Sequence, residues 1–266
     1  MDIFFYTIIF IMGITFGSFY TLAVYRIPKK QDITHTHSYC PNCNHKLDVF
    51  DLIPVLSYIF LGGKCKYCKQ KIRPRYLMLE IISGLFFVVL AYLMKLNFYD
   101  YNLLKIIEYG FLVLYFTFII LIAGIDKENK NINKPVLMYG VIISIMYMIY
   151  LYIIDKTSIY RYVIYLALLM LLLIVDTVTL KKHAKNNYTY SILIFIVIMA
   201  IFTGEYITIS SIIMTLLSIV IYLLIKRLKN NKNKKTYKKY STDFKIGFCL
   251  SIFNILYFIL VLICCY

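Results

Sequence analysis

Four cysteines in the N-terminal third of the chain have the spacing of a metal site. They form two Cys-x-x-Cys pairs separated by 21 residues: Cys40, Cys43, Cys65 and Cys68. Four thiolates can hold Zn²⁺ tetrahedrally without an open coordination position, so such a site is structural rather than catalytic. Two disulfides are the alternative, but thiols stay reduced in the cytosol, where this segment is predicted to lie. We therefore expect a structural zinc site, with His45 beside it as a bystander.

A second set of residues that could do chemistry consists of aspartates beside long apolar runs. Asp126 ends one run in LIAGIDKENK, and Asp243 opens the last run in YSTDFKIGF. Ionisable groups at membrane depth are costly, so each one is a candidate functional residue. Two carboxyl groups a few Å apart share a proton near neutrality, so one can activate water while the other donates a proton. This chemistry hydrolyses a peptide bond without a covalent intermediate or a catalytic metal.

Each aspartate also has a structural interpretation. A carboxylate at a helix end can reach water, and Asp243 stands where an N-cap would benefit from the helix dipole. Asp176, inside LLLIVDTVTLKKH, is the alternative second member of a pair. The catalytic interpretation is favoured for Asp126 and Asp243 because both lie at helix ends on the same predicted membrane face.

The elements that must position these residues are long apolar runs. Of 266 residues, 61% are hydrophobic and 16% are charged, which is typical of a polytopic membrane protein. Runs near 20 apolar residues can cross a hydrocarbon core of about 30 Å as helices. We predict about eight transmembrane helices, in residues 3–24, 78–97, 103–124, 135–154, 159–180, 189–203, 206–225 and 244–265.

The net charge of +16 is concentrated in particular loops. Lysine and arginine gather in residues 25–76, 181–185 and 226–239, whereas the intervening loops carry almost none. The positive-inside rule places the N-terminus outside. It places the basic loops, including the loop with the four cysteines, and Asp126 on the cytosolic side. The charge is thus explained by topology and by attraction to anionic lipids, and nucleic acid is not expected as a partner.

These features predict an all-α polytopic membrane protein with a small cytosolic zinc-binding loop domain. Residues 1–27 are expected to form the first transmembrane helix and residues 28–77 the four-cysteine zinc-binding domain. Residues 78–266 are expected to form the remaining transmembrane bundle, which carries the aspartates.

The motifs together resemble the type IV prepilin peptidases, membrane aspartyl proteases of the bacterial inner membrane. The resemblance rests on GSFYTLAVYRIP at residues 17–28, on CPNC, and on DLIPVLSYIFLGGKCKYCKQKIRPRYLMLE at residues 51–80. It continues in GIDKENKNIN, which is similar to the segment that holds the family's first catalytic aspartate and contains Asp126.

The match to the family's second aspartate is weaker. That aspartate lies in a Gly-x-Gly-Asp-x-Lys motif, and YSTDFKIGF keeps Asp243 and Lys245 but has Tyr240 and Thr242 at the glycine positions. Asp176 has the better spacing in the sequence but the poorer motif. The resemblance therefore implies Asp126 and Asp243 as the catalytic pair.

The resemblance implies removal of the basic leader of type IV prepilins or pseudopilins on the cytosolic side, just before a hydrophobic helix. Many members of the family also N-methylate the new N-terminus with S-adenosylmethionine, an activity associated with the cytosolic loop. Glu80 and Arg73 could belong to that site or could fix the loop against the bilayer. The lipid bilayer is the expected surrounding, and the oligomeric state is not indicated.

Two other classes of function fit the sequence. The lost glycines at Tyr240 and Thr242 suggest a catalytically degenerate relative, a prepilin-binding assembly or scaffold protein of the membrane. A transporter or channel would also use carboxylates in the membrane, but these carboxylates lie at helix ends, whereas a conducting path needs some at mid-bilayer.

Overall fold

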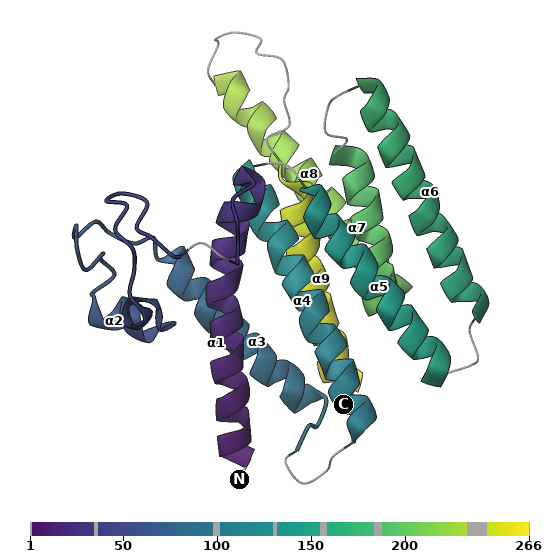
Figure 1. Cartoon of the computed structure of the whole chain (residues 1–266). Helices are drawn as coiled ribbons and strands as arrows, with labels where there is room; N and C mark the ends of the chain where they lie inside the picture. The colour runs from purple at the N-terminus through teal and green to yellow at the C-terminus, as the bar shows by residue number, and fades with distance from the viewer. Residues whose placement is uncertain are drawn as a thin grey trace. The chain divides into compact units, whose positions relative to one another are not determined.

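The computed structural model describes residues 2–34, 37–97, 102–129, 132–154, 159–183, 188–232 and 244–265. Within these residues the regular structure is helical, as predicted (Figure 1). The α-helices are α1 (Asp2–Arg26), α2 (Leu56–Phe60), α3 (Arg75–Leu93), α4 (Leu103–Asn129), α5 (Lys134–Ile154), α6 (Ile159–His183), α7 (Tyr188–Thr203), α8 (Glu205–Lys232) and α9 (Ile246–Cys265). Two 3₁₀ turns, η1 (Ile27–Lys29) and η2 (Val49–Leu52), lie between α1 and α3.

The long helices confirm a multi-pass membrane protein. Among the described residues, six helices are long and apolar enough to span a membrane: α1, α3, α4, α5, α8 and α9. Two shorter apolar helical stretches accompany them, Tyr160–Val175 in α6 and Tyr188–Thr203 in α7. Each predicted apolar run coincides with one of these helices. Only helices satisfy every backbone polar group within the run itself, which is what a hydrocarbon environment requires.

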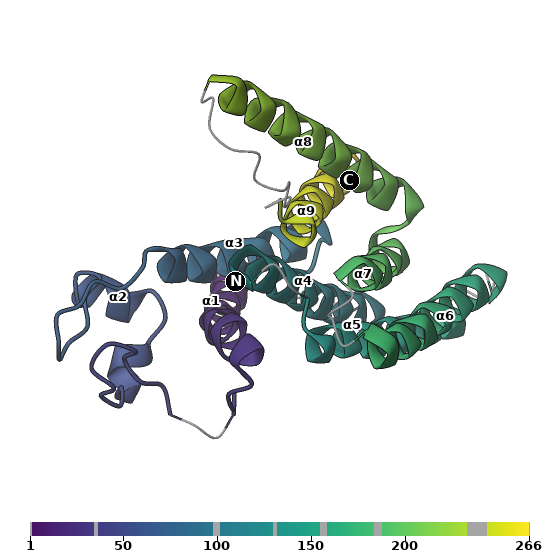
Figure 2. The same cartoon turned by 90° about the horizontal axis from the view of Figure 1, so that it is seen from above.

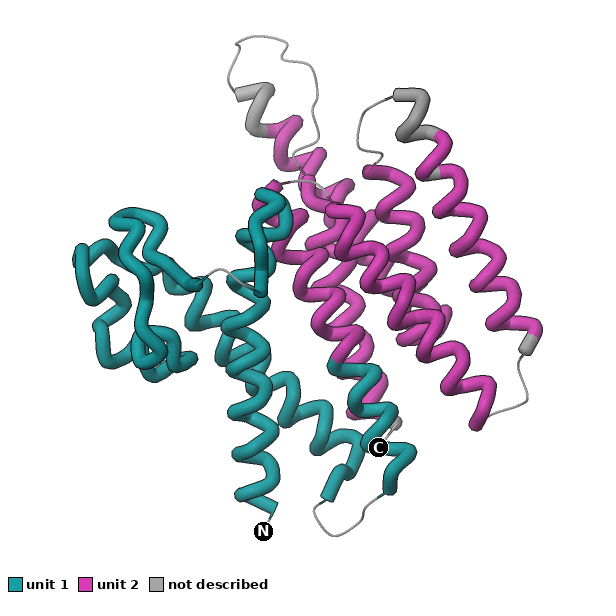
Figure 3. The backbone as a smooth tube through the Cα atoms, in the orientation of Figure 1, with its two compact units in different colours: residues 1–113 teal, residues 114–266 magenta. Residues whose placement is uncertain are grey.

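The chain divides into two compact units, residues 1–113 and residues 114–266 (Figure 3). Helix α4 begins in the first unit and ends in the second. The four cysteines belong to the first unit, and Asp126 belongs to the second. The division of the chain at residues 27 and 77 remains a prediction.

In the first unit, α1 packs along α3 through small residues. Gly13 and Gly17 form a Gly-x-x-x-Gly pattern on α1. A Cβ atom added to Gly13 would lie 2.7 Å from the Cα of Gly84, and one added to Gly17 would lie 2.7 Å from the Cα of Glu80. Small residues let two membrane helices approach closely, and dispersion forces then hold them together.

Replacing Gly17 by leucine is expected to destabilise the first unit, because its Cβ would clash with the backbone of α3. Overpacking a tight contact typically costs about 1–3 kcal/mol, occasionally more. Thermal unfolding in detergent or nanodiscs measures the effect. Gly110→Leu is the matched control, because a Cβ at Gly110 meets no atom within 4 Å. Equal melting temperatures for the two variants would contradict this account of the helix contact.

The second unit is built around α7, which packs against α5, α6, α8 and α9 (Figures 1 and 2). An aromatic ring of α7 joins the neighbouring helices. The ring of Phe202 stacks between those of Tyr115 in α4 and Tyr147 in α5, with ring centroids 4.5 and 4.6 Å apart. The Tyr115 hydroxyl donates to Asn254 Oδ1 of α9 at 2.8 Å, and Asn254 Nδ2 donates to Thr203 Oγ1 at 3.1 Å. Buried polar atoms therefore pair across the bundle, as the absence of water in a membrane demands.

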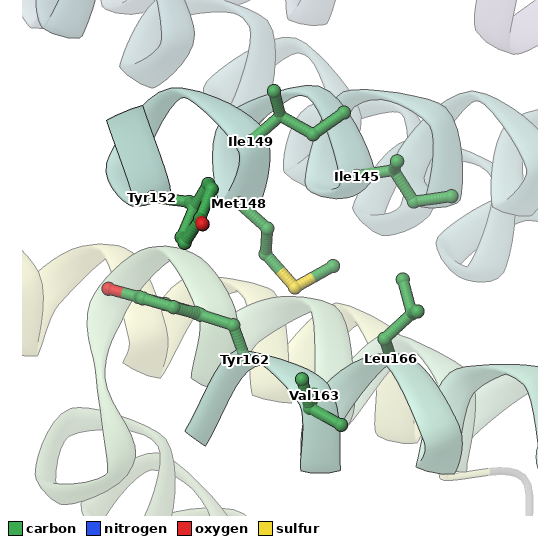
Figure 4. Close-up of a pocket in the computed structure, with 7 residues that line it drawn as sticks. All are labelled: Ile145, Met148, Ile149, Tyr152, Tyr162, Val163 and Leu166. Atoms are coloured by element: carbon green, nitrogen blue, oxygen red, sulfur yellow. The ribbon is translucent and has the colours of Figure 1, made fainter. Parts of the chain in front are cut away.

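A small apolar cavity of about 190 Å³ lies between α5 and α6 (Figure 4). It is lined by Ile145, Met148, Ile149, Tyr152, Tyr162, Val163 and Leu166. This lining contains no carboxylate, thiol or basic group. The cavity is therefore not a candidate for the hydrolytic chemistry predicted from the sequence.

Candidate metal and carboxylate sites

The two Cys-x-x-Cys pairs come together in the first unit. The Sγ atoms of Cys40, Cys43, Cys65 and Cys68 all lie within 4.8 Å of one another. The Sγ atoms of Cys40 and Cys68 are 3.8 Å apart. Four sulfurs placed tetrahedrally at about 2.3 Å from Zn²⁺ would be separated by about 3.8 Å. These four cysteines are free thiols, so the set can hold a metal ion and does not form the alternative disulfides.

The two pairs sit in turns with the same backbone structure. In each turn the first cysteine donates its N–H to the carbonyl five residues later and accepts the N–H of the residue four positions later. These bonds are Cys40 to His45, Asn44 to Cys40, Cys65 to Gln70 and Lys69 to Cys65, at 2.8–3.0 Å. The fourth residue after the first cysteine has positive φ in both, 57° at Asn44 and 59° at Lys69. Such repeated turns aim both thiols of a pair at one point.

The thiol of Cys68 is prepared for metal binding by its surroundings. A backbone hydrogen bond at Gln70 and the side chain of Asn42, whose Nδ2 lies 3.7 Å from Cys68 Sγ, lower the pKa of Cys68 to about 6. A metal ion binds the thiolate rather than the thiol. Within the cluster the thiolate is therefore favoured at Cys68, whereas at Cys43 the hydrogen bond at His45 is outweighed by burial and the neighbouring thiols, which raise its pKa.

Polar contacts hold η2 against the second cysteine turn. Tyr67 donates its hydroxyl to Asp48 Oδ2 at 3.0 Å and to Asp51 Oδ2 at 3.2 Å. Burial, and then the hydrogen bond to Asp48, raise the pKa of Tyr67 to about 12, so the phenol stays a donor at neutral pH. Lys66 Nζ approaches the same two carboxylates at 3.9 and 3.8 Å. The ring of His45 stacks on Tyr67, with centroids 3.6 Å apart, and this histidine is not among the candidate ligands.

Glu80 connects the loop to the transmembrane helices. Its Oε2 accepts the N–H of Val55 at 2.7 Å, and Val55 is the centre of a tight turn with φ 64° and ψ −53°. Leu56 closes this turn by donating its N–H to the carbonyl of Pro54. A valine in this conformation is strained, so the buried carboxylate of Glu80 is one of the contacts that hold it. This contact supports the structural interpretation of Glu80.

Asp126 belongs to α4, and its side chain lies against the first turn of α9 within the second unit. Its side chain is fully buried, with 0% of the residue exposed. Oδ1 accepts the hydroxyl of Tyr188 at 2.7 Å, and Oδ2 accepts the backbone N–H of Phe248 at 2.9 Å. The N–H of Gly247 in turn donates to the Tyr188 oxygen at 3.4 Å. The dipole of α4 disfavours a carboxylate in its last turn, where Asp126 lies. The N–H groups in the first turn of α9 carry partial positive charge and offset this cost.

Gly247 permits this close approach. A Cβ at this position would lie 3.2 Å from Asp126 Oδ2, tighter than nine in ten real Cβ contacts. Sequence reasoning selected Asp126 but missed Tyr188, Gly247 and Phe248 as its partners. The glycine four residues after Asp243 was the one available signal, since glycine often marks a close backbone approach.

The second predicted aspartate is not placed. Asp243, Tyr240 and Thr242 lie outside the described residues, and the chain is described again from Phe244. Asp176, the alternative, belongs to α6. The pairing of Asp126 with either aspartate therefore stays a prediction.

Comparisons with known proteins find similarity in the N-terminal part of the chain. Residues 11–94 match the family model described as the Bacterial Peptidase A24 N-terminal domain. These residues include all four cysteines of the candidate metal site and Glu80. Neither Asp126 nor Asp243 lies within the matched range.

Several curated relatives bear the name prepilin leader peptidase/N-methyltransferase, among them proteins of Bacillus subtilis, Vibrio cholerae and Klebsiella pneumoniae. The Bacillus subtilis protein is 41% identical over 81 residues, which is 30% of this chain and 33% of that protein. The Vibrio cholerae protein is 38% identical over 85 residues, 29% of this chain and 34% of that protein. The Klebsiella pneumoniae protein is 35% identical over 92 residues, 32% of this chain and 40% of that protein.

The matches therefore span between 33% and 40% of the length of these relatives. No solved structure matches the chain. The resemblance to the type IV prepilin peptidases that the motifs predict is confirmed, and it is carried by the segment that contains the cysteine cluster.

Proposed function

We propose that this chain is a membrane peptidase that removes the basic leader of type IV prepilins or pseudopilins. The observation that carries the proposal is the similarity of residues 11–94 to proteins named prepilin leader peptidase. The buried carboxylate of Asp126, oriented by donors from α7 and α9, supports it from the other unit. Charge asymmetry supports a cytosolic position for the cysteine loop and the active site.

In the proposed mechanism Asp126 and Asp243 act as a pair. Asp243 is four residues before Gly247, so their Cα atoms are at most about 14 Å apart along the chain. Gly247 contacts the Asp126 region directly, which makes Asp243 a reachable partner. One carboxylate takes a proton from water as the water oxygen bonds to the scissile carbonyl carbon. The other gives its proton to the leaving nitrogen as the carbon–nitrogen bond breaks.

Co-expression with a type IV prepilin tests the proposal. The wild-type chain should convert the prepilin to a shorter product whose mass corresponds to loss of the leader. Asp243→Asn should block this conversion, whereas Asp176→Asn should leave it unchanged. If the Asp243→Asn variant converts the prepilin and the Asp176→Asn variant does not, the second catalytic aspartate is Asp176 of α6. Absence of conversion by the wild-type chain would reject the peptidase.

The hydroxyl of Tyr188 is expected to contribute to the same reaction by orienting Asp126. Hydrogen bonds to charged groups are worth about 1.5–3 kcal/mol, so Tyr188→Phe should lower kcat/KM about 10- to 100-fold. Cleavage kinetics on a prepilin substrate measure the loss. Tyr190→Phe, two residues along the same helix, is the matched control and should cleave at the wild-type rate. Wild-type kinetics in Tyr188→Phe would show that this contact does not serve catalysis.

The proposed metal is Zn²⁺, held by Cys40, Cys43, Cys65 and Cys68. Four thiolates complete a tetrahedral shell, so the ion would stabilise the loop and would not take part in hydrolysis.

N-methylation of the new N-terminus is proposed from the second half of the relatives' name, with S-adenosylmethionine as the methyl donor. Transfer of labelled methyl groups from that donor to the cleaved pilin would test it. A cleaved but unmethylated product would restrict the chain to peptidase activity.

A non-catalytic prepilin-binding protein is the second candidate. Full burial of Asp126 and its hydrogen bonds to Tyr188 and Phe248 favour it, because a carboxylate can cap a helix without doing chemistry. Such a protein would bind a prepilin and never release the leader. The co-expression experiment separates the two candidates.

A further inference from the structure

The loop between α1 and α3 carries an unusually exposed apolar surface, which we call the hydrophobic loop face. It is formed by η2, α2 and the residues joining them. Phe60 is 84% exposed, and Val49 and Phe50 are each 80% exposed. The other large members are Leu52, Ile53, Leu56 and Ile59, between 38% and 60% exposed. Contiguous apolar patches on a protein surface mark interaction sites.

The outward direction of this face is built into the loop. Asp48 and Asp51, on either side of Val49 and Phe50, are held by the hydroxyl of Tyr67. Each also forms a capping contact with the backbone of η2. These contacts engage the two aspartates, whereas Val49 and Phe50 between them are each 80% exposed. The fold thus exposes these two apolar side chains while it holds the aspartates that flank them.

The face lies beside the transmembrane helices. Val55, between η2 and α2, donates its N–H to Glu80 of α3. Glu80 in turn packs on Gly17 of α1, whose added Cβ would lie 2.7 Å from the Glu80 Cα. Gly17 is nine residues before Arg26, the last residue of α1, which corresponds to about 14 Å along the helix. In Figures 1 and 2, α2 lies to the side, near the start of α3, and not past the end of α1.

The charges of the same loop complement an anionic surface. Five exposed basic residues accompany the hydrophobic loop face in addition to Lys66: Lys46, Lys64, Lys69, Lys71 and Arg73. The acidic residues Asp48 and Asp51 are engaged by Lys66 and Tyr67 within the loop. Basic residues close to a membrane-inserted apolar segment attract anionic lipid headgroups.

We propose that the hydrophobic loop face inserts into the leaflet at the C-terminal end of α1, with the surrounding lysines and Arg73 on anionic headgroups. The zinc loop would then be a peripheral membrane element that is fixed in depth rather than a freely exposed domain. This inference rests on the first unit alone and is independent of the peptidase activity. The apolar helix of a protein substrate is the competing occupant, and the experiment below distinguishes it.

The chain contains no tryptophan, so one introduced tryptophan reports its own position. Phe50→Trp and Phe60→Trp are placed separately in the full chain, which is reconstituted in bilayers with and without brominated acyl chains. Ile11→Trp, on an exposed face of α1, is the bilayer reference. Gln31→Trp, past the end of α1, is the water reference. Bromine quenches only a ring that reaches the hydrocarbon.

Insertion predicts that both loop tryptophans lose most of their emission in brominated lipid, as Ile11→Trp does, whereas Gln31→Trp loses little. Their emission should shift further to the blue when anionic lipid replaces part of a zwitterionic bilayer. The same weak quenching in Phe50→Trp, Phe60→Trp and Gln31→Trp would overturn the proposal. A blue shift that appears only after addition of a prepilin would also overturn it and would assign the face to the substrate.

Discussion

Asp126→Asn is expected to abolish leader cleavage while leaving the transmembrane bundle folded. Asparagine has the size of aspartate, and its oxygen can still accept one of the two hydrogen bonds made by Tyr188 and Phe248. It cannot take or give the proton that the hydrolysis requires. General acid–base groups contribute about 10²- to 10⁴-fold to a rate, so kcat/KM should fall by at least that order. Cleavage of a purified prepilin, followed by mass, measures the loss.

Folding and catalysis can be separated for this variant. Glu108→Gln removes a different carboxylate of α4, which also carries Glu128, and should leave cleavage unchanged. The Asp126→Asn protein should unfold within a few degrees of the wild type, since it loses about one charged hydrogen bond. A variant that retains cleavage would remove Asp126 from the active site. A variant that no longer folds would assign Asp126 to the helix-capping role alone.

Removal of the proposed Zn²⁺ is expected to unfold the loop between α1 and α3 and to leave the other helices intact. Among the described residues 29–73, the buried apolar residues are Cys40 and Cys65, which are themselves candidate ligands. Such a loop has almost no apolar core of its own. Binding of structural zinc supplies about 10–16 kcal/mol in small zinc-binding peptides, far more than the other contacts here can replace.

Limited proteolysis with and without a chelator measures this effect, alongside the zinc content of the purified chain. Cys65→Ser should reproduce the chelated state, with cleavage in the loop and protected transmembrane helices. Cys249→Ser, in α9 and outside the cysteine cluster, is the control and should keep the metal. A loop that resists protease equally well after zinc removal would contradict a metal-dependent fold.

The features that depend on local sequence could be predicted. The Cys-x-x-Cys spacing of Cys40, Cys43, Cys65 and Cys68 requires only two short turns that meet, and the cluster is present. The apolar runs located the transmembrane helices because hydrocarbon tolerates few other structures.

The partners of Asp126 could not be predicted, because they depend on packing between distant segments. Tyr188 is 62 residues away along the chain and Phe248 is 122 residues away. A tyrosine near the end of an apolar run is typical of an interfacial anchor, yet Tyr188 donates to a carboxylate and Tyr115 donates to Asn254 inside the bundle. Val55 gave no sign of its positive φ, which valine disfavours and which is accompanied by a contact with Glu80.

The claim that Asp126 and Asp243 work as one catalytic pair is tested most directly by a double-mutant cycle on leader cleavage. The measurement is kcat/KM for the purified wild type, Asp126→Asn, Asp243→Asn and the double variant on one prepilin. Residues that act as a unit give non-additive losses, so the double variant should be no slower than either single variant. Losses that multiply, or full activity in Asp243→Asn, would show that the two aspartates do not form the pair.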